Sequence, residues 1–293
     1  MGTPMRYALL GAGGQLGRDL QSRLQGEVVA WTREQADLTR PMDLRAALEA
    51  LRPEIVVNCA AYNLVDKAES YPAGAFAVNA WGVRDLALAC RDLGCVLVHF
   101  STDYVFGLDE NNRIPWTETD APGPIGVYGL SKLAGEYLVR SLCPRHFVVR
   151  TCGLYGVWGS GGKGGNFVET MLRLAAQGKP VRVVADQSCT PTYTVDLAAA
   201  TAALATTERY GLYHVTNSGS CSWYEFAAAI FERSGIKAEL APITSREFGA
   251  TARRPAYSVL STSAYHALGL PLLRPWQEAL AAYLDERGRK NRT

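Results

Sequence analysis

The chain has 293 residues, of which 48% are hydrophobic and 20% charged, a composition that excludes an intrinsically disordered protein. The 30 basic and 28 acidic side chains leave a formal net charge of +2, so neither nucleic acid nor a membrane surface is expected as a partner. We expect a cytoplasmic protein, because no early apolar run is long enough for export and the seven cysteines are scattered without a Cys-x-x-Cys pair.

Apolar runs of strand length alternate with helical patterns through the first half of the chain. The predicted strands are residues 7–10, 28–31, 55–59, 95–101 and 147–151, and the predicted helices are 14–24, 41–51, 73–93 and 128–142. This alternation is typical of an α/β protein whose parallel sheet has helices on both faces. We therefore expect residues 1–151 to form mainly a Rossmann-like, doubly wound domain.

The pattern is less regular after residue 151. Helices are predicted at 167–177, 194–205, 223–235 and 276–287, and strands at 181–185 and 211–216. We expect residues 152–293 to form mainly a smaller α/β lobe that binds substrate, with the chain free to cross between the lobes. The tail from Gly288 is expected to fray.

The first motif is a glycine-rich stretch between the first predicted strand and helix. Glycines at 11, 14 and 17 allow a tight turn, let a pyrophosphate approach the backbone and let the helix pack closely. The helix N-terminus then offers free N–H groups to the phosphates. Because the glycine-rich stretch lies directly after a strand and before a helix, it predicts a dinucleotide-binding site. In other positions a glycine-rich loop is often only a turn.

The second motif is Tyr128-Gly-Leu-Ser-Lys132, in which four residues place both side chains on one face of a helix. An ammonium group beside a phenol favours the phenolate, which suits acid–base chemistry. The third motif, Ser101 to Phe106, follows the fourth strand directly. A hydroxyl at the carboxyl end of a strand can reach a substrate carbonyl, although such residues also simply end strands.

These motifs, in this order, carry a family resemblance. The chain resembles the extended short-chain dehydrogenase/reductase family and, within it, the branch of dTDP-4-dehydrorhamnose reductases. Further matching stretches are 57–62, 65–69, 78–80, 132–136, 165–167 and 252–255. The glycine turn and the Tyr-x-x-x-Lys pair specify the superfamily, and residues 65–69, 101–106 and 252–255 narrow it to the branch.

The resemblance implies NAD(P)H-dependent reduction of the C4 keto group of a dTDP-4-dehydro-6-deoxysugar, foremost dTDP-4-dehydro-L-rhamnose to dTDP-L-rhamnose. Tyr128 would donate a proton to the C4 oxygen, and Thr102 would hydrogen-bond the carbonyl or Tyr128. Lys132 would hold the nicotinamide ribose and lower the pKa of Tyr128. The implied cofactor contacts are Gly11, Gly14, Gln15, Leu16, Gly17, Arg33, Asp37, Leu38, Ala60, Ala61, Tyr62, Tyr128 and Lys132. The implied substrate contacts are Thr102, Asp103, Asn166 and Arg254.

Two arginines have alternative interpretations. Arg254 suits a diphosphate because its guanidinium can donate two parallel hydrogen bonds to one phosphate group. Alternatively, it could form a structural ion pair with an acidic residue of the same lobe. Relatives often have an acidic residue at the position of Thr32, and that side chain accepts a hydrogen bond from the ribose 2′-OH of NAD. In this chain Thr32 is followed by Arg33. We therefore expect NADPH to be preferred and NADH to be usable, unless Arg33 is merely a solvated loop residue.

The chain departs from the family pattern at three places. Gly153 replaces a common tryptophan near the sugar, Gly126 replaces a common asparagine, and residues 157–163 form a longer insert at the entrance. Other functions therefore stay open: another nucleotide-sugar 4-ketoreductase, a 4-epimerase that retains its cofactor, or a non-catalytic regulatory subunit. The four histidines lie far apart, so no metal site is expected, and the protein would be a monomer or homodimer.

Overall fold

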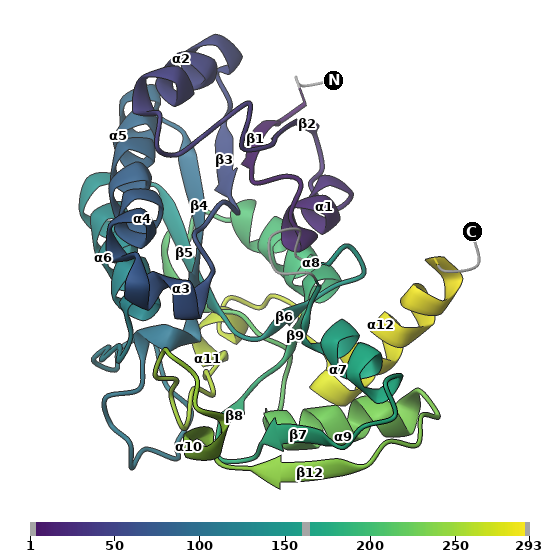
Figure 1. Cartoon of the computed structure of the whole chain (residues 1–293). Helices are drawn as coiled ribbons and strands as arrows, with labels where there is room; N and C mark the ends of the chain where they lie inside the picture. The colour runs from purple at the N-terminus through teal and green to yellow at the C-terminus, as the bar shows by residue number, and fades with distance from the viewer. Residues whose placement is uncertain (1–3, 160–164, 291–293) are drawn as a thin grey trace.

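The computed structural model describes residues 4–159 and 165–290. At its centre is a sheet of six parallel strands in the order β10-β5-β4-β3-β1-β2 (Figure 1). The strands are β1 (Arg6–Leu10), β2 (Glu27–Trp31), β3 (Ile55–Asn58), β4 (Val96–Thr102), β5 (His146–Thr151) and β10 (Gly211–His214). The expected Rossmann-like α/β fold is confirmed.

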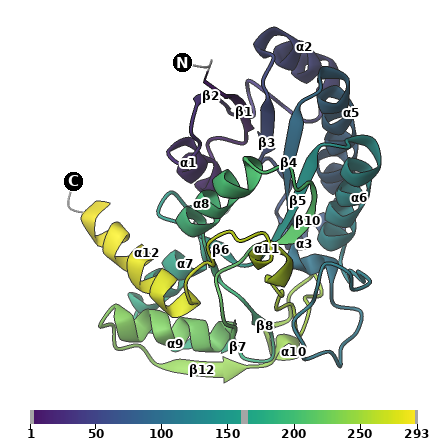
Figure 2. The ribbon, with the colours of Figure 1, turned by 180° about the vertical axis from the view of Figure 1, so that it is seen from behind.

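Helices cover both faces of the sheet (Figures 1 and 2). One face carries α1 (Gln15–Gln21), α8 (Thr194–Ala205) and α11 (Ser263–His266), and the other carries α2 (Pro41–Leu51), α5 (Val83–Leu93) and α6 (Val127–Leu142). Leu20 and Leu197 belong to the first apolar layer, and Leu86 and Val139 to the second. Burial of these layers against the Val- and Leu-rich strands holds the sheet together.

The predicted helix 73–93 is not one regular helix. The segment contains α4 (Pro72–Phe76), the π-helix η1 (Ala77–Gly82) and α5, and it is preceded by the unpredicted helix α3 (Val65–Ser70). The π-helix ends at Gly82, which packs closely against the preceding loop: a Cβ there would lie 2.5 Å from the carbonyl oxygen of Leu38. π-helical turns are rare and frequently lie beside functional sites.

The smaller lobe packs around aromatic side chains, among them Tyr155, Phe226, Trp276 and Tyr283. Its helices are α7 (Phe167–Ala175), α9 (Trp223–Arg233), α10 (Ser245–Phe248) and α12 (Trp276–Lys290). Its strands pair as β7 (Val181–Val184) with β12 (Leu240–Ile243), β8 (Ser188–Cys189) with β11 (Cys221–Ser222), and β6 (Leu154–Tyr155) with β9 (Thr192–Tyr193). Figure 1 shows this lobe below the sheet.

The second half of the chain also contributes to the sheet layer. Helix α8 packs against α1, and β10 pairs with β5 at the edge of the sheet. The expected fraying from Gly288 is wrong for residues 288–290, which continue α12, while residues 291–293 and 160–164 lie outside the described part. No helix among the described residues is long and apolar enough to cross a membrane.

Candidate active site

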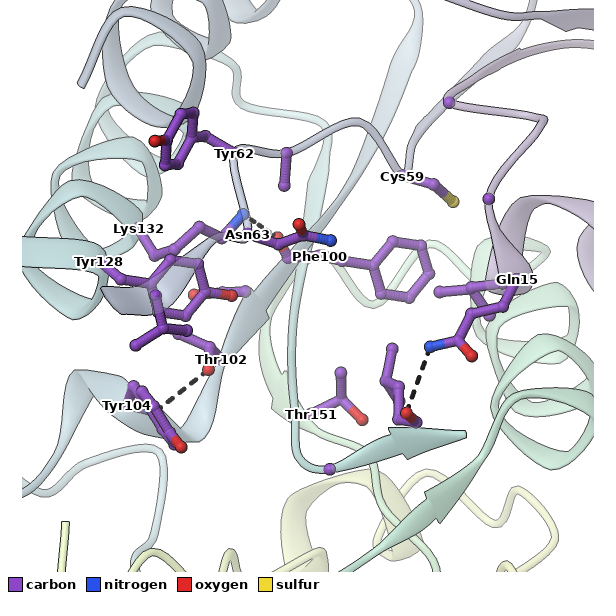
Figure 3. Close-up of a pocket in the computed structure, with 18 of the residues that line it drawn as sticks. Gln15, Cys59, Tyr62, Asn63, Phe100, Thr102, Tyr104, Tyr128, Lys132 and Thr151 are labelled. Atoms are coloured by element: carbon purple, nitrogen blue, oxygen red, sulfur yellow. Dashed lines mark hydrogen bonds between the residues drawn. The ribbon is translucent and has the colours of Figure 1, made fainter. Parts of the chain in front are cut away.

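A cavity of about 1420 Å³ lies at the carboxyl ends of the central strands. Strand β1 has β2 on one side and β3 on the other, and open α/β sheets bind ligands where the strand order reverses in this way. All the expected site residues line this one cavity: Gly11, Gly14, Gln15, Leu16, Gly17, Arg33, Asp37, Leu38, Ala60, Ala61, Tyr62, Thr102, Asp103, Tyr128, Lys132, Asn166 and Arg254. Figure 3 shows Thr102, Tyr128 and Lys132 on one side and Gln15 on the opposite side.

The glycine turn between β1 and α1 has no room for a side chain at Gly11 or Gly17. Gly11 has φ +71°, and a Cβ there would lie 2.7 Å from the backbone nitrogen of Ala60. A Cβ at Gly17 would lie 2.5 Å from the Gly11 carbonyl oxygen. The start of α1 carries no side-chain cap, because Gly14 occupies the N-cap. A turn pressed against the end of β3 and followed by an uncapped helix start fits a dinucleotide pyrophosphate.

Tyr128 and Lys132 lie one turn apart on α6 and face the end of β4. The Thr102 hydroxyl hydrogen-bonds the phenol of Tyr128 and donates to Asp103 Oδ1 at 3.0 Å. Lys132 Nζ donates to the carbonyl oxygen of Phe100 at 2.6 Å. A close backbone approach brings the elements together, because Gly129 on α6 packs on the Tyr104 carbonyl where a Cβ would collide.

Burial controls the ionisation of the two titratable groups. It raises the pKa of Tyr128 to about 12, against the lowering effect of the Thr102 hydrogen bond. Burial also lowers the pKa of Lys132 to about 8, although the Glu136 carboxylate acts in the opposite direction. The expected lowering of the Tyr128 pKa by Lys132 is not seen, because Lys132 is not among the groups that shift this pKa; burial dominates, and Tyr128 stays protonated at neutral pH.

Asp103 links the end of β4 to the smaller lobe. Its Oδ2 accepts from the Cys152 thiol at 3.0 Å and from the Ser258 hydroxyl at 2.6 Å, while burial raises its pKa. Cys152 and Ser258 also line the cavity, and no motif in the sequence had singled them out. Asp103 therefore lies at the floor of the cavity with its acceptor sites already occupied.

The remaining expected substrate residues make protein contacts of their own. Arg254 donates to both carboxylate oxygens of Asp66, at 3.2 and 2.7 Å, so its partner comes from α3 and not from its own lobe. Asn166 caps α7 by accepting from the Glu169 N–H at 3.0 Å and donates to the Gly156 carbonyl at 2.9 Å. Its amide thus supports the local fold as well as lining the cavity.

A loop after β3 closes the cofactor side of the cavity. Asn79, on the π-helix, accepts from the Tyr62 N–H at 2.8 Å and donates to the Tyr62 carbonyl at 2.9 Å. The same amide donates to Ser131 on α6 at 3.0 Å. Sequence reasoning had noted residues 78–80 as a family stretch without giving Asn79 this role. The π-turn therefore fastens the loop to the helix that carries Tyr128.

Residues 5–288 match the family described as RmlD substrate binding domain. The chain belongs to this family. A dTDP-4-dehydrorhamnose reductase of Streptomyces griseus is 44% identical over 94% of this chain and 91% of the relative. A dTDP-4-keto-6-deoxy-D-glucose reductase of Streptomyces niveus is 40% identical over 94% of this chain and 95% of the relative. A crystal structure of the Bacillus anthracis dTDP-4-dehydrorhamnose reductase in complex with NADP is 39% identical, with a TM-score of 0.92 and coverage of 97% and 100%.

The departure from the family pattern at Gly153 is filled from elsewhere in the chain. Gly153 has φ +53°, and a Cβ there would lie 3.3 Å from the Trp223 ring. Trp223 begins α9 and lines the cavity. Trp223 therefore forms the aromatic wall beside residue 153, and any side chain at 153 would have to press on Trp223 or on the equally close Pro191. The sequence alone could not show this, because the two residues are 70 positions apart.

The departure at Gly126 is compensated in a similar way. Gly126 is the N-cap of α6 and has no side chain to offer, but Glu69 Oε1 accepts from the Val127 N–H at 2.8 Å. A Cβ at Gly126 would lie 2.9 Å from that carboxylate oxygen. Glu69 therefore performs from α3 the capping role that an asparagine side chain could perform locally.

Two of the four histidines lie deep in the protein. His99 and His214 are fully buried in the sheet layer, and burial together with the Arg150 charge lowers the pKa of His214 to about 3. Across residues 4–159 and 165–290, no group of three or more His, Cys, Asp or Glu side chains is arranged to hold a metal ion.

Proposed function

We propose that this protein is an NADPH-dependent reductase of the C4 keto group of a dTDP-4-dehydro-6-deoxysugar, with dTDP-4-dehydro-L-rhamnose as its substrate. The observation that carries the proposal is the meeting of Thr102, Tyr128 and Lys132 in the same cavity as the glycine turn. The family relationship and the reductase named among the relatives support the choice of substrate.

The cofactor would extend across the switch point of the sheet. Its pyrophosphate would lie on the glycine turn at Gly14 and Gln15, and its adenine end beside Asp37 and Leu38. NADPH, when bound, supplies the hydride that reduces the C4 carbon. Lys132 would hold the nicotinamide ribose from the opposite side of the cavity.

The protein's own part in the reaction is to hold the carbonyl and deliver a proton. Tyr128 donates its phenolic proton to the C4 oxygen, and its high pKa keeps that proton in place at neutral pH until the oxygen becomes basic. The Thr102 hydroxyl fixes the phenol through its hydrogen bond to Tyr128 and donates its one proton to Asp103 Oδ1. Rotation of that proton from Asp103 towards the substrate would give the carbonyl a second donor.

The diphosphate of the substrate would bind at Arg254. The guanidinium lies on the cavity wall and forms an ion pair with Asp66. A phosphate group bound there would compete with the Asp66 carboxylate for the same N–H donors of Arg254. The pair joins α3 to the loop before residue 255, and substrate binding would therefore involve both halves of the chain.

A second sugar is a specific alternative. The Streptomyces niveus relative is named as a reductase of dTDP-4-keto-6-deoxy-D-glucose. Gly153, where the family often has a tryptophan, lines the cavity beside Trp223, so this part of the wall is built from different residues than the family pattern. A reductase that makes a different 6-deoxyhexose would use the same Thr102, Tyr128 and Lys132.

The test is turnover by the full chain. The protein is incubated with NADPH and either dTDP-4-dehydro-L-rhamnose or dTDP-4-keto-6-deoxy-D-glucose, loss of reduced-cofactor absorbance is followed, and the product is identified by NMR. Consumption with the first sugar and formation of dTDP-L-rhamnose are expected. Conversion without consumption of NADPH would indicate an epimerase, and no reaction with either sugar would favour a non-catalytic subunit.

The proposal also includes the cellular compartment and the oligomeric state. The seven cysteines are free thiols, which supports a reducing compartment, and we place the protein in the cytoplasm as a monomer or homodimer.

A further inference from the structure

A row of three polar side chains runs beneath the cavity. Asn58 ends β3, His99 lies in the middle of β4, and Lys132 points to them from α6; their exposed fractions are 1%, 0% and 2%. Asn58 Nδ2 lies 3.1 Å from His99 Nδ1, and His99 Nε2 lies 3.5 Å from Lys132 Nζ. The proposed reaction has no use for Asn58 or His99, although burying polar groups is costly unless they are paired.

The hydrogen bonds fix which ring nitrogen of His99 carries the proton. The backbone N–H of Ala60 donates to Asn58 Oδ1 at 3.0 Å, so the amide oxygen faces Ala60 and the NH₂ group faces the ring. An NH₂ group can only donate, and His99 Nδ1 must therefore accept. Burial and the nearby charge of Lys132 keep the pKa of His99 well below its ordinary value, so the ring is neutral. Its single proton is then on Nε2.

The Nε2–H group faces Lys132. A lysine ammonium has three donors and no acceptor, whereas the neutral amine has a lone pair that can accept from Nε2–H. The contact therefore favours the neutral amine over the ammonium. The Phe100 carbonyl acts in the opposite direction, because it accepts from Nζ at 2.6 Å.

The other groups around Lys132 come from three segments. The loop directly after β3 contributes the Cys59 thiol, β4 contributes His99, and α6 itself contributes the Glu136 carboxylate and the Tyr128 phenol. Glu136 favours the ammonium, but its carboxylate is engaged by Arg150 and Ser101. With His99 neutral, the charges in this cluster are those of Lys132 and Glu136.

We propose that Asn58 and His99 are positioning residues for Lys132: Asn58 holds His99 in the Nε2–H tautomer, and that N–H eases release of the Lys132 proton. Lys132 can then return a proton to the cavity at near-neutral pH, when Tyr128 has given its own away. The effect on turnover rests on the proposed reductase function, whereas the tautomer is a property of the protein alone.

The tautomer is tested directly by ¹⁵N NMR of the full chain labelled at its histidines, with His99→Leu used to assign the His99 signals. Wild type is expected to show a protonated Nε2 and an unprotonated Nδ1. In Asn58→Asp the carboxylate accepts from the ring and Ala60 can still donate to it, so the proton is expected to move to Nδ1. A protonated Nδ1 in wild type, or no change in Asn58→Asp, would overturn the proposal whether or not the protein reduces the sugar.

The consequence for Lys132 is tested by the pH dependence of kcat/KM with NADPH and the 4-keto sugar. In Asn58→Asp, the fall of kcat/KM on the alkaline side of the pH profile should begin about one pH unit higher. The reason is that Nε2 then accepts a hydrogen bond from the Lys132 ammonium and stabilises it. The added carboxylate could cause the same shift by charge alone, and the double variant Asn58→Asp/His99→Leu controls for this. In the His99→Leu background, adding Asn58→Asp should cause no shift of the pH profile. If Asn58→Asp shifts the profile equally with and without His99, or lowers the rate without shifting the profile, a role through His99 is contradicted.

Discussion

The carboxylate of Glu69 accepts a hydrogen bond from the backbone N–H of Val127 at 2.8 Å, across 58 residues of chain. Val127 is the first residue of α6, the helix that carries Tyr128 and Lys132. The helix has no side-chain cap of its own because Gly126 precedes it. The acid therefore satisfies an N–H group that would otherwise lack a partner and places negative charge at the helix start.

Replacement of Glu69 by alanine should loosen the start of α6. Loss of an N-cap typically costs about 0.5–2 kcal/mol, and we expect that decrease in the free energy of unfolding together with a lower kcat. Glu69→Gln keeps an acceptor without the charge and should recover most of both. Denaturant unfolding and steady-state kinetics measure the two effects. A glutamine variant as impaired as the alanine variant would show that the charge matters more than the cap.

Tyr128→Phe should abolish most turnover and leave the cofactor site intact. The phenol is the proposed proton donor, and general acid catalysis contributes roughly 10²–10⁴-fold. NADPH binding, followed by cofactor fluorescence, should stay close to wild type. Lys132→Met should impair both turnover and NADPH binding. Near-normal kcat in Tyr128→Phe would remove it from the proposed chemistry.

Deprotonation of Lys132 should cause the loss of activity on the alkaline side of the pH profile. As pH rises through about 8, Lys132 loses its proton, whereas Tyr128, with a pKa of about 12, keeps its own. If the ammonium is required, kcat/KM falls about tenfold per pH unit above that point. Lys132→Arg cannot lose its charge in this range and should give a flat profile at a lower rate. A wild-type profile that stays flat across this range would contradict the assignment.

Arg254→Ala should raise KM for the nucleotide sugar far more than KM for NADPH. The change removes a bidentate partner of the proposed diphosphate and leaves Tyr128 and Lys132 in place. Asp66→Asn is the matched control, because it breaks the same ion pair but keeps the guanidinium. If the arginine binds phosphate, only Arg254→Ala weakens sugar binding. Equal losses of melting temperature in both variants, with unchanged KM, would indicate a structural pair.

The sequence predicted the sheet, the principal helices and the cavity residues because these depend on local pattern and on motif position. Alternation of apolar runs sets the strands, and parallel strands bring their carboxyl ends to one edge. Gly11, Thr102 and Tyr128, far apart in the chain, thus meet in one cavity. The roles proposed for them remain predictions until the variants are measured.

The long-range side-chain contacts could not be predicted in the same way. Trp223 against Gly153, Glu69 at the start of α6 and Asp66 with Arg254 depend on how distant segments pack, and their spacing carries no periodic signal. Burial also reversed one electrostatic expectation. Lys132 lies within a helical turn of Tyr128, yet the pKa of that tyrosine rises, because burial removes the phenol from water and the nearby Asp103 charge acts in the same direction.

The geometry at the end of β2 bears on which nicotinamide cofactor is preferred. Thr32 follows β2 and donates to the Glu34 carboxylate, while Arg33 pairs with Asp37 at 3.0 Å and is 77% exposed. All four residues line the cavity. A 2′-phosphate at this rim would meet an exposed guanidinium that can bind it bidentately, but also the charge of Glu34.

We therefore expect a wild-type preference for NADPH that depends on Arg33. Arg33→Ala should lower kcat/KM with NADPH and leave the value with NADH nearly unchanged, because NADH has no 2′-phosphate for the guanidinium to bind. Glu34→Gln removes a nearby negative charge and should change NADPH use in the opposite direction. Steady-state kinetics with each cofactor, for wild type and both variants, measure the effects. A wild type that favours NADH several-fold, with that preference lost in Glu34→Gln, would instead identify Glu34 as the acid that reads the ribose 2′-OH.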